Sequence, residues 1–82
     1  MVTTIFEPSF QKTFSKIKDK VLKERIFKQI SKIRENPEVG KPMKHARKGT
    51  REVYIPPFRL SYAYLPEEQK IILLDFYHKD EQ

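Results

Sequence analysis

The chain has 82 residues, enough for one small domain with a modest core but near the size at which folded domains become marginally stable. Its 17 lysines and arginines outnumber its 11 acidic residues, and the net charge of +6 predicts a polyanionic partner such as nucleic acid, or an acidic protein. With no cysteine and only two histidines, the sequence excludes disulfides, thiolate catalysis and cysteine-based zinc sites, and we expect no metal and no cofactor.

Membrane insertion and secretion are not expected from this sequence. No apolar run approaches the roughly 18 residues that a membrane-spanning helix needs. The first residues also lack the signal-peptide order of a basic segment, an apolar run and a small-residue cleavage site. We therefore expect a single domain over residues 1–82 that acts in the cytoplasm and does not bind membranes.

The first half of the chain is expected to form a strand and two helices. Residues 2–6 are mostly β-branched or aromatic and favour a short strand that ends before Pro8. Residues 18–20 then separate two helical stripes that differ in register, joined either by a tight turn or by a bend, and we favour a helical hairpin with Asp19 as the second N-cap. The stripes recur at spacings of three and four and consist of Phe10, Phe14, Ile17 and Val21, then Leu22, Ile26, Ile30 and Ile33.

The second half is expected to form a three-stranded antiparallel meander. Asn36 and Pro37 end the helices, and Gly40 and Pro42 mark a loop. The strands are predicted at residues 51–55, 58–65 and 70–77, with breaks at Pro56–Pro57 and at residues 65–68. This order fits an α+β domain in which the helical hairpin covers one face of the sheet and leaves the other face open for a ligand.

Side-chain alternation assigns residues of the last two strands to the two faces of the sheet. The predicted core face carries Phe58, Leu60, Tyr62 and Tyr64 from one strand and Ile72, Leu74, Phe76 and His78 from the other. The predicted open face carries Arg59, Ser61 and Ala63 together with Asp75, Tyr77 and Lys79. We therefore expect the polar chemistry on the open face and place His78 behind it.

Arg59 is the most specific candidate for contact with a ligand. Its guanidinium is a planar, permanently charged fork that suits bidentate binding of a phosphate, and its small neighbours Ser61 and Ala63 leave room beside it. The alternative is an ordinary strand arginine that pairs with a carboxylate such as Asp75.

A basic segment without any acidic residue precedes the meander. It carries Lys41, Lys44, His45, Arg47, Lys48 and Arg51. Such a segment either contacts phosphates with little sequence selectivity or is a solvated loop. At the other end of the meander, His78 has the chemistry of a general acid or base near neutral pH, and Tyr77 either stacks on a base or covers the end of the core.

In this order, the segments resemble small toxins of the RelE/ParE superfamily, the toxic halves of bacterial and archaeal toxin–antitoxin pairs. The opening FEPSF and the helical pair ending at Asn36 and Pro37 are similar to the family pattern. The run GTREVYIPPFRLSYAYLPEEQKIILLDFYHKDE resembles its R-E strand, its Y-R-hydrophobic-hydrophobic-Y strand and its closing G-H-R-K segment. The order and spacing of these motifs, which cover nearly the whole chain, carry the resemblance.

The resemblance implies a reaction and roles for several residues. RelE-like members cut messenger RNA in the ribosomal A site, by attack of a ribose 2′-OH on the adjacent phosphorus. Arg59 would stabilise the phosphate, Lys79 stands where a second catalytic arginine usually lies, and His78 matches a histidine used in acid–base chemistry in one branch. Tyr77 replaces the family's glycine, which implies either a phenol supplied by another route or a weakened activity. RNA and ribosome contacts are implied for Lys41, Lys44, Arg47, Lys48 and Arg51, and one of these lysines is a candidate base.

The resemblance also implies partners. A cognate acidic antitoxin, partly disordered until it binds, would hold the toxin inactive, and operator DNA would be reached only through it. The leading expectation is a metal-independent, ribosome-dependent mRNA endonuclease that inhibits translation. The alternatives are a ParE-like toxin that poisons DNA gyrase, and a degenerate, non-catalytic module that binds RNA or the antitoxin.

Overall fold

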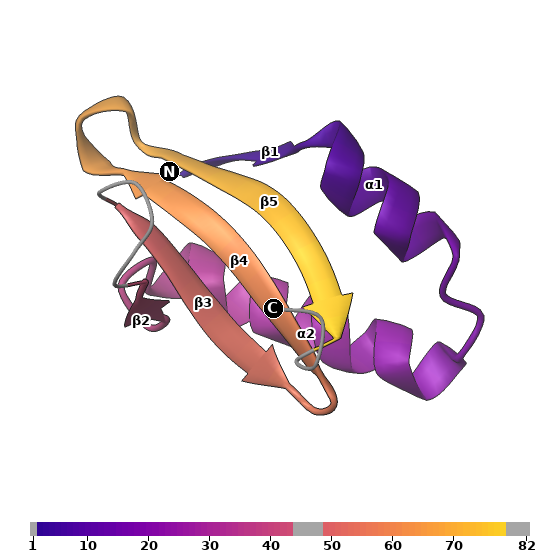
Figure 1. The fold of residues 1–82 in the computed structure, drawn as a ribbon. Coiled ribbons are helices and arrows are strands. Elements are labelled where there is room, and N and C mark those ends of the chain that lie inside the picture. The colour runs from indigo at the N-terminus through magenta and orange to yellow at the C-terminus, as the bar shows by residue number, and fades with distance from the viewer. Residues whose placement is uncertain (1, 44–48, 79–82) are drawn as a thin grey trace.

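The computed structural model describes residues 2–43 and 49–78 of the chain. Its elements in order are β1 (Thr3–Phe6), α1 (Pro8–Ser15), α2 (Lys20–Glu35), β2 (Lys41–Pro42), β3 (Thr50–Ile55), β4 (Phe58–Leu65), a 3₁₀ turn (Pro66–Glu68) and β5 (Lys70–His78). Within these ranges the strands form one sheet in the order β1-β5-β4-β3-β2, in which only β1 and β5 pair in parallel (Figure 1). The predicted α+β fold with a helical hairpin and a three-stranded meander is confirmed, and the short strand β2 replaces part of the predicted loop.

The second helix of the hairpin, α2, begins where the sequence predicted, with Asp19 as its N-cap. The Asp19 carboxylate accepts hydrogen bonds from the backbone N–H groups of Val21 at 2.9 Å and Leu22 at 3.3 Å. These bonds satisfy donors that the first turn of a helix leaves unpaired. Of the two predicted connections, a turn between two helices is confirmed and a bend within one helix is wrong. Val21 was assigned to the buried stripe of the first helix, but it belongs to α2 and its side chain is 65% exposed, so that assignment was wrong.

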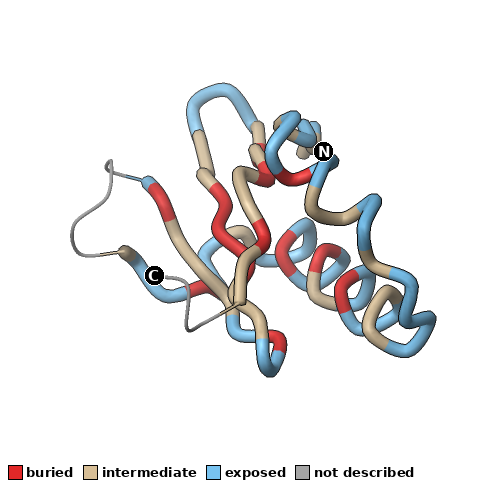
Figure 2. Tube along the Cα trace, turned by 45° about the vertical axis from the view of Figure 1, so that its right-hand side comes forward, coloured by how far each residue is buried: buried red, intermediate tan, exposed pale blue. Residues whose placement is uncertain are grey.

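The helices cover one side of the sheet. In Figure 1, α2 passes behind β3, β4 and β5, while α1 lies beside β5, and no helix stands in front of these strands. β1 pairs with β5 as far as Leu73, and α1 then continues along the same edge, where the Ser9 hydroxyl donates to the Leu74 carbonyl at 2.5 Å. Buried residues gather where α2 and the sheet face each other (Figure 2). The opposite face of β3–β5 is thus left for polar side chains.

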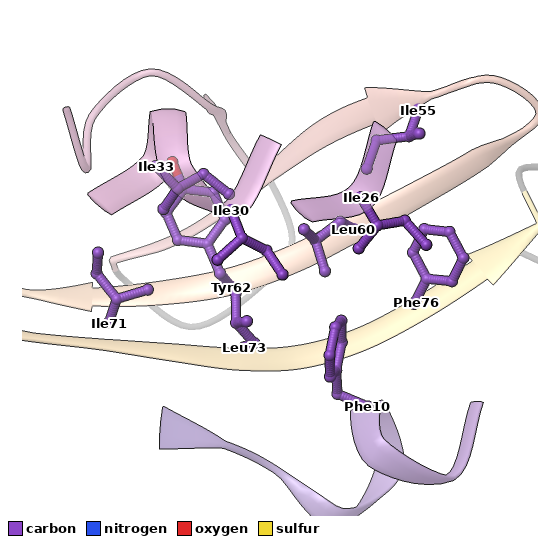
Figure 3. Packing of buried hydrophobic residues seen from close by; sticks show 10 residues of the cluster. All are labelled: Phe10, Ile26, Ile30, Ile33, Ile55, Leu60, Tyr62, Ile71, Leu73 and Phe76. Atoms are coloured by element: carbon purple, nitrogen blue, oxygen red, sulfur yellow. The ribbon is translucent and has the colours of Figure 1, made fainter. Parts of the chain in front are cut away.

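The core lies between α2 and the sheet, with one contribution from α1. Its residues are at most 8% exposed and interdigitate in one cluster (Figure 3). They are Phe10, Ile26, Ile30, Ile33, Ile55, Leu60, Tyr62, Ile71, Leu73 and Phe76. Burial of each large apolar side chain stabilises the fold by about 1.5–3 kcal/mol. The prediction that Tyr62 and Tyr64 are core or rim residues is confirmed, since Tyr62 is fully buried and Tyr64 packs against the cluster.

A β-bulge in β5 changes which of its residues enter the core. Ser61 of β4 pairs with Asp75, whereas the next residue, Tyr62, pairs with Leu73, so Leu74 is an extra residue without a partner on β4. The assignment of Ile72 and Leu74 to the core was therefore wrong. Ile71 and Leu73 are buried in their place, because the alternation predicted from the C-terminal end of the strand does not continue through a bulge.

The end of β5, after the bulge, keeps the predicted alternation. Phe76 is buried in the core, and the His78 ring packs beside Phe58 on the same side of the sheet. Tyr77 lies opposite Arg59 on β4, on the open face. The bulge therefore separates a segment of predominantly apolar residues from a segment that carries polar groups.

The Tyr62 hydroxyl ties β4 to the segment that follows α2. It accepts a hydrogen bond from the Gly40 N–H at 2.9 Å and donates one to the Pro37 carbonyl at 2.7 Å. Gly40 has no space for a side chain, because a Cβ atom would lie 2.7 Å from this hydroxyl and 2.8 Å from the Glu52 carbonyl oxygen. The close approach of the three chain segments therefore requires glycine at this position.

Replacing Tyr62 with phenylalanine is expected to lower the free energy of unfolding by about 1–2 kcal/mol, because one buried and one partly buried backbone group lose their partner while the ring packing is kept. Burial raises the pKa of Tyr62 above its ordinary value of 10.0, against the smaller effects of the Gly40 hydrogen bond and the Arg51 charge. Because the pKa of Tyr62 is higher in the folded state than in the unfolded state, the protonated hydroxyl contributes its full stabilisation below the unfolded-state pKa. That contribution is lost as the pH rises through the folded-state pKa.

Urea unfolding of both proteins between neutral pH and the tyrosine titration range tests the role of this hydroxyl. Above the ordinary tyrosine pKa, the wild type is expected to lose stability more steeply than Tyr62→Phe. An equal loss of stability in the two proteins would contradict a role for the Tyr62 hydroxyl, because the other tyrosines are common to both.

Candidate functional site

Three polar side chains meet on the open face of the sheet. The Arg59 Nη1 donates to Glu52 Oε1 at 2.8 Å, and the Tyr77 hydroxyl donates to Glu52 Oε2 at 3.2 Å. The Glu52 carboxylate on β3 thus bridges a guanidinium on β4 and a phenol on β5. We call this group the Glu52–Arg59–Tyr77 cluster.

Strand register explains why the cluster forms. Arg59 on β4 lies opposite Tyr54 on β3 and opposite Tyr77 on β5. Glu52 lies two residues before Tyr54 and therefore on the same face of the sheet, within reach of Arg59 along a diagonal. The two-residue turn at Pro56 and Pro57 determines this register, since Ile55 pairs directly with Phe58.

Arg59 does pair with a carboxylate, but not with the predicted one. The Asp75 carboxylate instead accepts a hydrogen bond from the N–H of Phe76 at 2.8 Å, within its own strand. The partner Glu52 was missed because the prediction considered only neighbours on the last two strands. Ser61, which was expected to leave room beside Arg59, is only 5% exposed, so space for a ligand lies on the β3 side instead.

A pocket of about 420 Å³ opens beside the cluster at the edge of β3. Its lining includes Gln29 from α2, Lys41 from β2, and Glu52, Tyr54 and Arg59 from the sheet. β2 pairs only with Arg51 and Glu52, so no described strand covers the outer edge of β3 after Glu52. Among the predicted RNA-binding lysines, Lys41 falls within the described residues, and it lines the same pocket as Arg59.

The Arg59 side chain is half-buried and only partly satisfied. Its side chain is 33% exposed, and that of Glu52 is 19% exposed. Apart from the bond to Glu52, its guanidinium makes no hydrogen bond to the described part of the chain, and its Nε is buried without an acceptor. Its carbon Cζ lies 6.0 Å from the centroid of the Tyr54 ring. A guanidinium has five N–H donors in a fixed fork, so donors remain for an anion in the pocket.

The structure does not bring two of the predicted site residues to this cluster. The His78 ring lies edge-on to Phe58, with the centroids 5.5 Å apart, on the side of the sheet opposite Arg59. The Arg51 guanidinium donates to the carbonyl oxygens of Glu38 at 3.0 Å and Gly40 at 2.7 Å. Arg51 therefore holds the segment between α2 and β2, and a direct role in RNA contact stays a prediction.

The remaining predicted residues Lys44, Arg47, Lys48 and Lys79 lie outside the described residues. In residues 2–43 and 49–78, no group of three or more histidine and acidic side chains is placed to hold a metal ion. Nor does any helix in those ranges have the length and apolar character needed to cross a membrane.

Comparison with known proteins relates this chain to a protein family. The sequence profile described as ParE toxin of type II toxin-antitoxin system, parDE, matches residues 4–82. No curated protein sequence matches the chain significantly.

Several solved toxin structures share the fold at low sequence identity. The isolated RelE toxin of E. coli is 14% identical with a TM-score of 0.81, over 95% of this chain and 84% of that chain. The toxin–antitoxin complex RelBE2 of Mycobacterium tuberculosis matches at 22% identity and a TM-score of 0.78, over 95% of this chain and 98% of that chain. A metal-bound toxin from Helicobacter pylori matches at 21% identity and a TM-score of 0.78, over 99% and 98% of the two chains.

These matches agree with the resemblance found in the sequence. The profile match, together with the shared fold, identifies the chain as a small toxin of the RelE/ParE superfamily. Because the profile covers almost the whole chain, the chain belongs to the ParE toxin family of type II toxin–antitoxin systems.

Proposed function

We propose that this toxin cleaves messenger RNA on the ribosome by attack of a ribose 2′-OH on the adjacent phosphorus. The observation that carries the proposal is the Glu52–Arg59–Tyr77 cluster beside an open pocket. The reaction needs a base for the 2′ proton, donors for the extra negative charge on the phosphate, and an acid for the leaving 5′ oxygen. The cluster offers groups for the second and third of these functions.

In this proposal Arg59 binds the phosphate oxygens and stabilises their growing charge. Tyr77 lies opposite Arg59 and gives its phenolic proton to the 5′ oxygen as the bond from phosphorus to that oxygen breaks. The products are a 2′,3′-cyclic phosphate and a free 5′-OH. Glu52 is a positioning residue that orients both donors through its two oxygens. The proposed base is a lysine of the basic segment, and Lys79 is proposed as a second cation that binds the phosphate. His78 takes no part in this proposal, because its ring packs beside Phe58 on the other side of the sheet.

The test uses messenger RNA translated by purified ribosomes. Primer extension first maps the position that is cut, and a second RNA then carries 2′-deoxyribose at that position alone. We expect cleavage of the first RNA and none of the second, because the deoxy sugar lacks the nucleophile. Intact RNA in both cases, with folded protein free of antitoxin, would contradict the proposal, as would equal cleavage of both.

Poisoning of DNA gyrase is the second candidate function, and the match to the ParE profile favours it. Gyrase-poisoning toxins of this superfamily act by docking on a protein and do not need ribose chemistry. A supercoiling assay with purified gyrase separates the two functions. A gyrase poison would inhibit supercoiling and leave the messenger RNA intact.

We also propose that an acidic antitoxin binds this protein in the cytoplasm and controls it. The net charge of +6 supports an acidic partner, and the similar fold in the RelBE2 complex is found bound to an antitoxin. Contact with operator DNA would then occur only through the antitoxin.

A further inference from the structure

We propose that a second basic surface, on helix α2, binds the phosphate backbone of RNA and leads it to the Glu52–Arg59–Tyr77 cluster. This surface, the α2 basic stripe, consists of Arg25, Lys28 and Lys32. It is separate from the basic segment that the sequence singled out. The inference rests on the proposed RNA substrate but does not depend on cleavage.

The three cations of the stripe lie on one face of α2. They occupy positions i, i+3 and i+7, so their Cα atoms are spaced by about 4.5–6 Å along the helix axis. All three residues are exposed, whereas Ile26, Ile30 and Ile33 of the same helix are buried in the core. The helix therefore presents a row of positive charge to the solvent.

Acidic neighbours do not neutralise this row. Glu24 and Glu35 lie within about one turn of Lys28 and Lys32, yet in the described part of the chain no ion pair within 4.0 Å involves a side chain of α2. The ion pairs that do form are those of Glu38, Glu52 and Glu68 with cations elsewhere. The stripe charges are thus available to an external anion.

A groove connects the stripe to the candidate site. The groove measures about 180 Å³ and lies between the three stripe residues and the end of the β3–β4 hairpin. It shares Gln29 and Tyr54 with the pocket beside Arg59, so the two hollows adjoin at the edge of β3. Figure 1 shows α2 passing behind this hairpin. Tyr54 is 50% exposed at the junction and offers a ring on which a base can stack.

The chemistry of the groove favours a phosphate backbone over an acidic protein segment. A segment that folds on binding gains much of its affinity from apolar anchors in an apolar groove. One wall of the stripe groove consists of the three cations with Gln29, and the other consists of Tyr54, Pro56 and the buried Ile55. The exposed aromatic residues Phe6 and Phe27 line a different groove, between α1 and α2. A polyanion that needs no apolar anchor therefore fits the stripe better.

Fluorescence anisotropy with a labelled single-stranded RNA tests the inference. The 2′-OH groups of the RNA are methylated, so cleavage cannot contribute and a failure here is distinct from a failure of the proposed nuclease. The stripe variant R25Q/K28Q/K32Q is compared with the control K12Q/K18Q/K20Q, which loses the same charge from exposed positions outside the groove. Urea unfolding verifies that both variants are folded.

The stripe variant is expected to bind about 10- to 100-fold more weakly at about 0.1 M salt, with a salt slope smaller by about 2, because each lost phosphate contact removes about 0.7 from the slope. The control should weaken by less than about threefold, since its charges act only at a distance. Equal weakening of both variants would overturn the inference. A peptide of alternating glutamate and alanine is the second probe, and a stripe variant that loses this peptide more than the RNA would assign the surface to an acidic protein instead.

Discussion

Replacement of Arg59 by alanine is expected to lower the rate of A-site cleavage by about 10²- to 10³-fold, the usual cost of removing one donor that stabilises transition-state charge. Arg59 is the guanidinium that the structure places beside the open pocket and next to a phenol. The measurement is single-turnover cleavage of messenger RNA on programmed ribosomes, with the variant supplied in excess.

Two further variants make the Arg59 experiment specific. Arg59→Lys keeps the charge but loses the fork, so it should recover only a small part of the rate if bidentate binding matters. Arg34→Ala removes an exposed arginine from α2 outside the stripe and should cleave normally. Full activity of a folded Arg59→Ala protein would remove Arg59 from the mechanism.

Replacement of Glu52 by alanine is expected to slow cleavage by about 10- to 100-fold at saturating RNA, because the guanidinium and the phenol lose the group that aligns them. RNA affinity should stay the same or rise, since a negative charge next to the phosphate site has been removed. Single-turnover rates measured over a range of RNA concentrations separate the rate effect from the affinity effect.

Glu52→Gln distinguishes alignment from proton transfer. The glutamine oxygen still accepts the hydrogen bond from Arg59, and the glutamine NH₂ group can donate one to the Tyr77 hydroxyl, so a positioning role predicts recovery of most of the rate. A glutamine variant as slow as the alanine variant would show that the charge itself is required, and would make Glu52 a candidate base. Glu68→Ala, which removes an exposed acid paired with Lys70 at 3.3 Å, serves as the control.

The elements of the fold were predictable because their signals are local. Asp19 caps α2 through N–H groups two and three residues away, and Asn36 and Pro37 end the helix through their own backbone preferences. The bulge at Leu74 was not predictable in this way, since it becomes visible only when β5 is paired with β4. The pairing of Lys41–Pro42 with β3 depends likewise on a contact between distant segments.

The candidate site was predicted in part for the same reason. Alternation along single strands placed Arg59 and Tyr77 together on the open face. Predicting that Glu52 joins them required the register between β3 and β4, which can be worked out from the sequence. Counting back from the turn at Pro56–Pro57 places Tyr54 opposite Arg59, and Glu52 then falls on the same face. The α2 basic stripe could not be singled out from the sequence, because its significance depends on the groove that the β3–β4 hairpin forms beside α2.

The extra residue in β5 has a chemical consequence for both faces of the sheet. If β5 continued the pairing of Tyr62 with Leu73 without interruption, Asp75 would lie opposite Leu60 in the apolar core, and Phe76 would lie opposite Arg59. The offset of one residue keeps an ionised carboxylate out of the core, where its desolvation would be costly. It also gives Arg59 a neighbour with a transferable proton in place of a hydrocarbon ring, so a detail of backbone pairing determines which chemistry this face can perform.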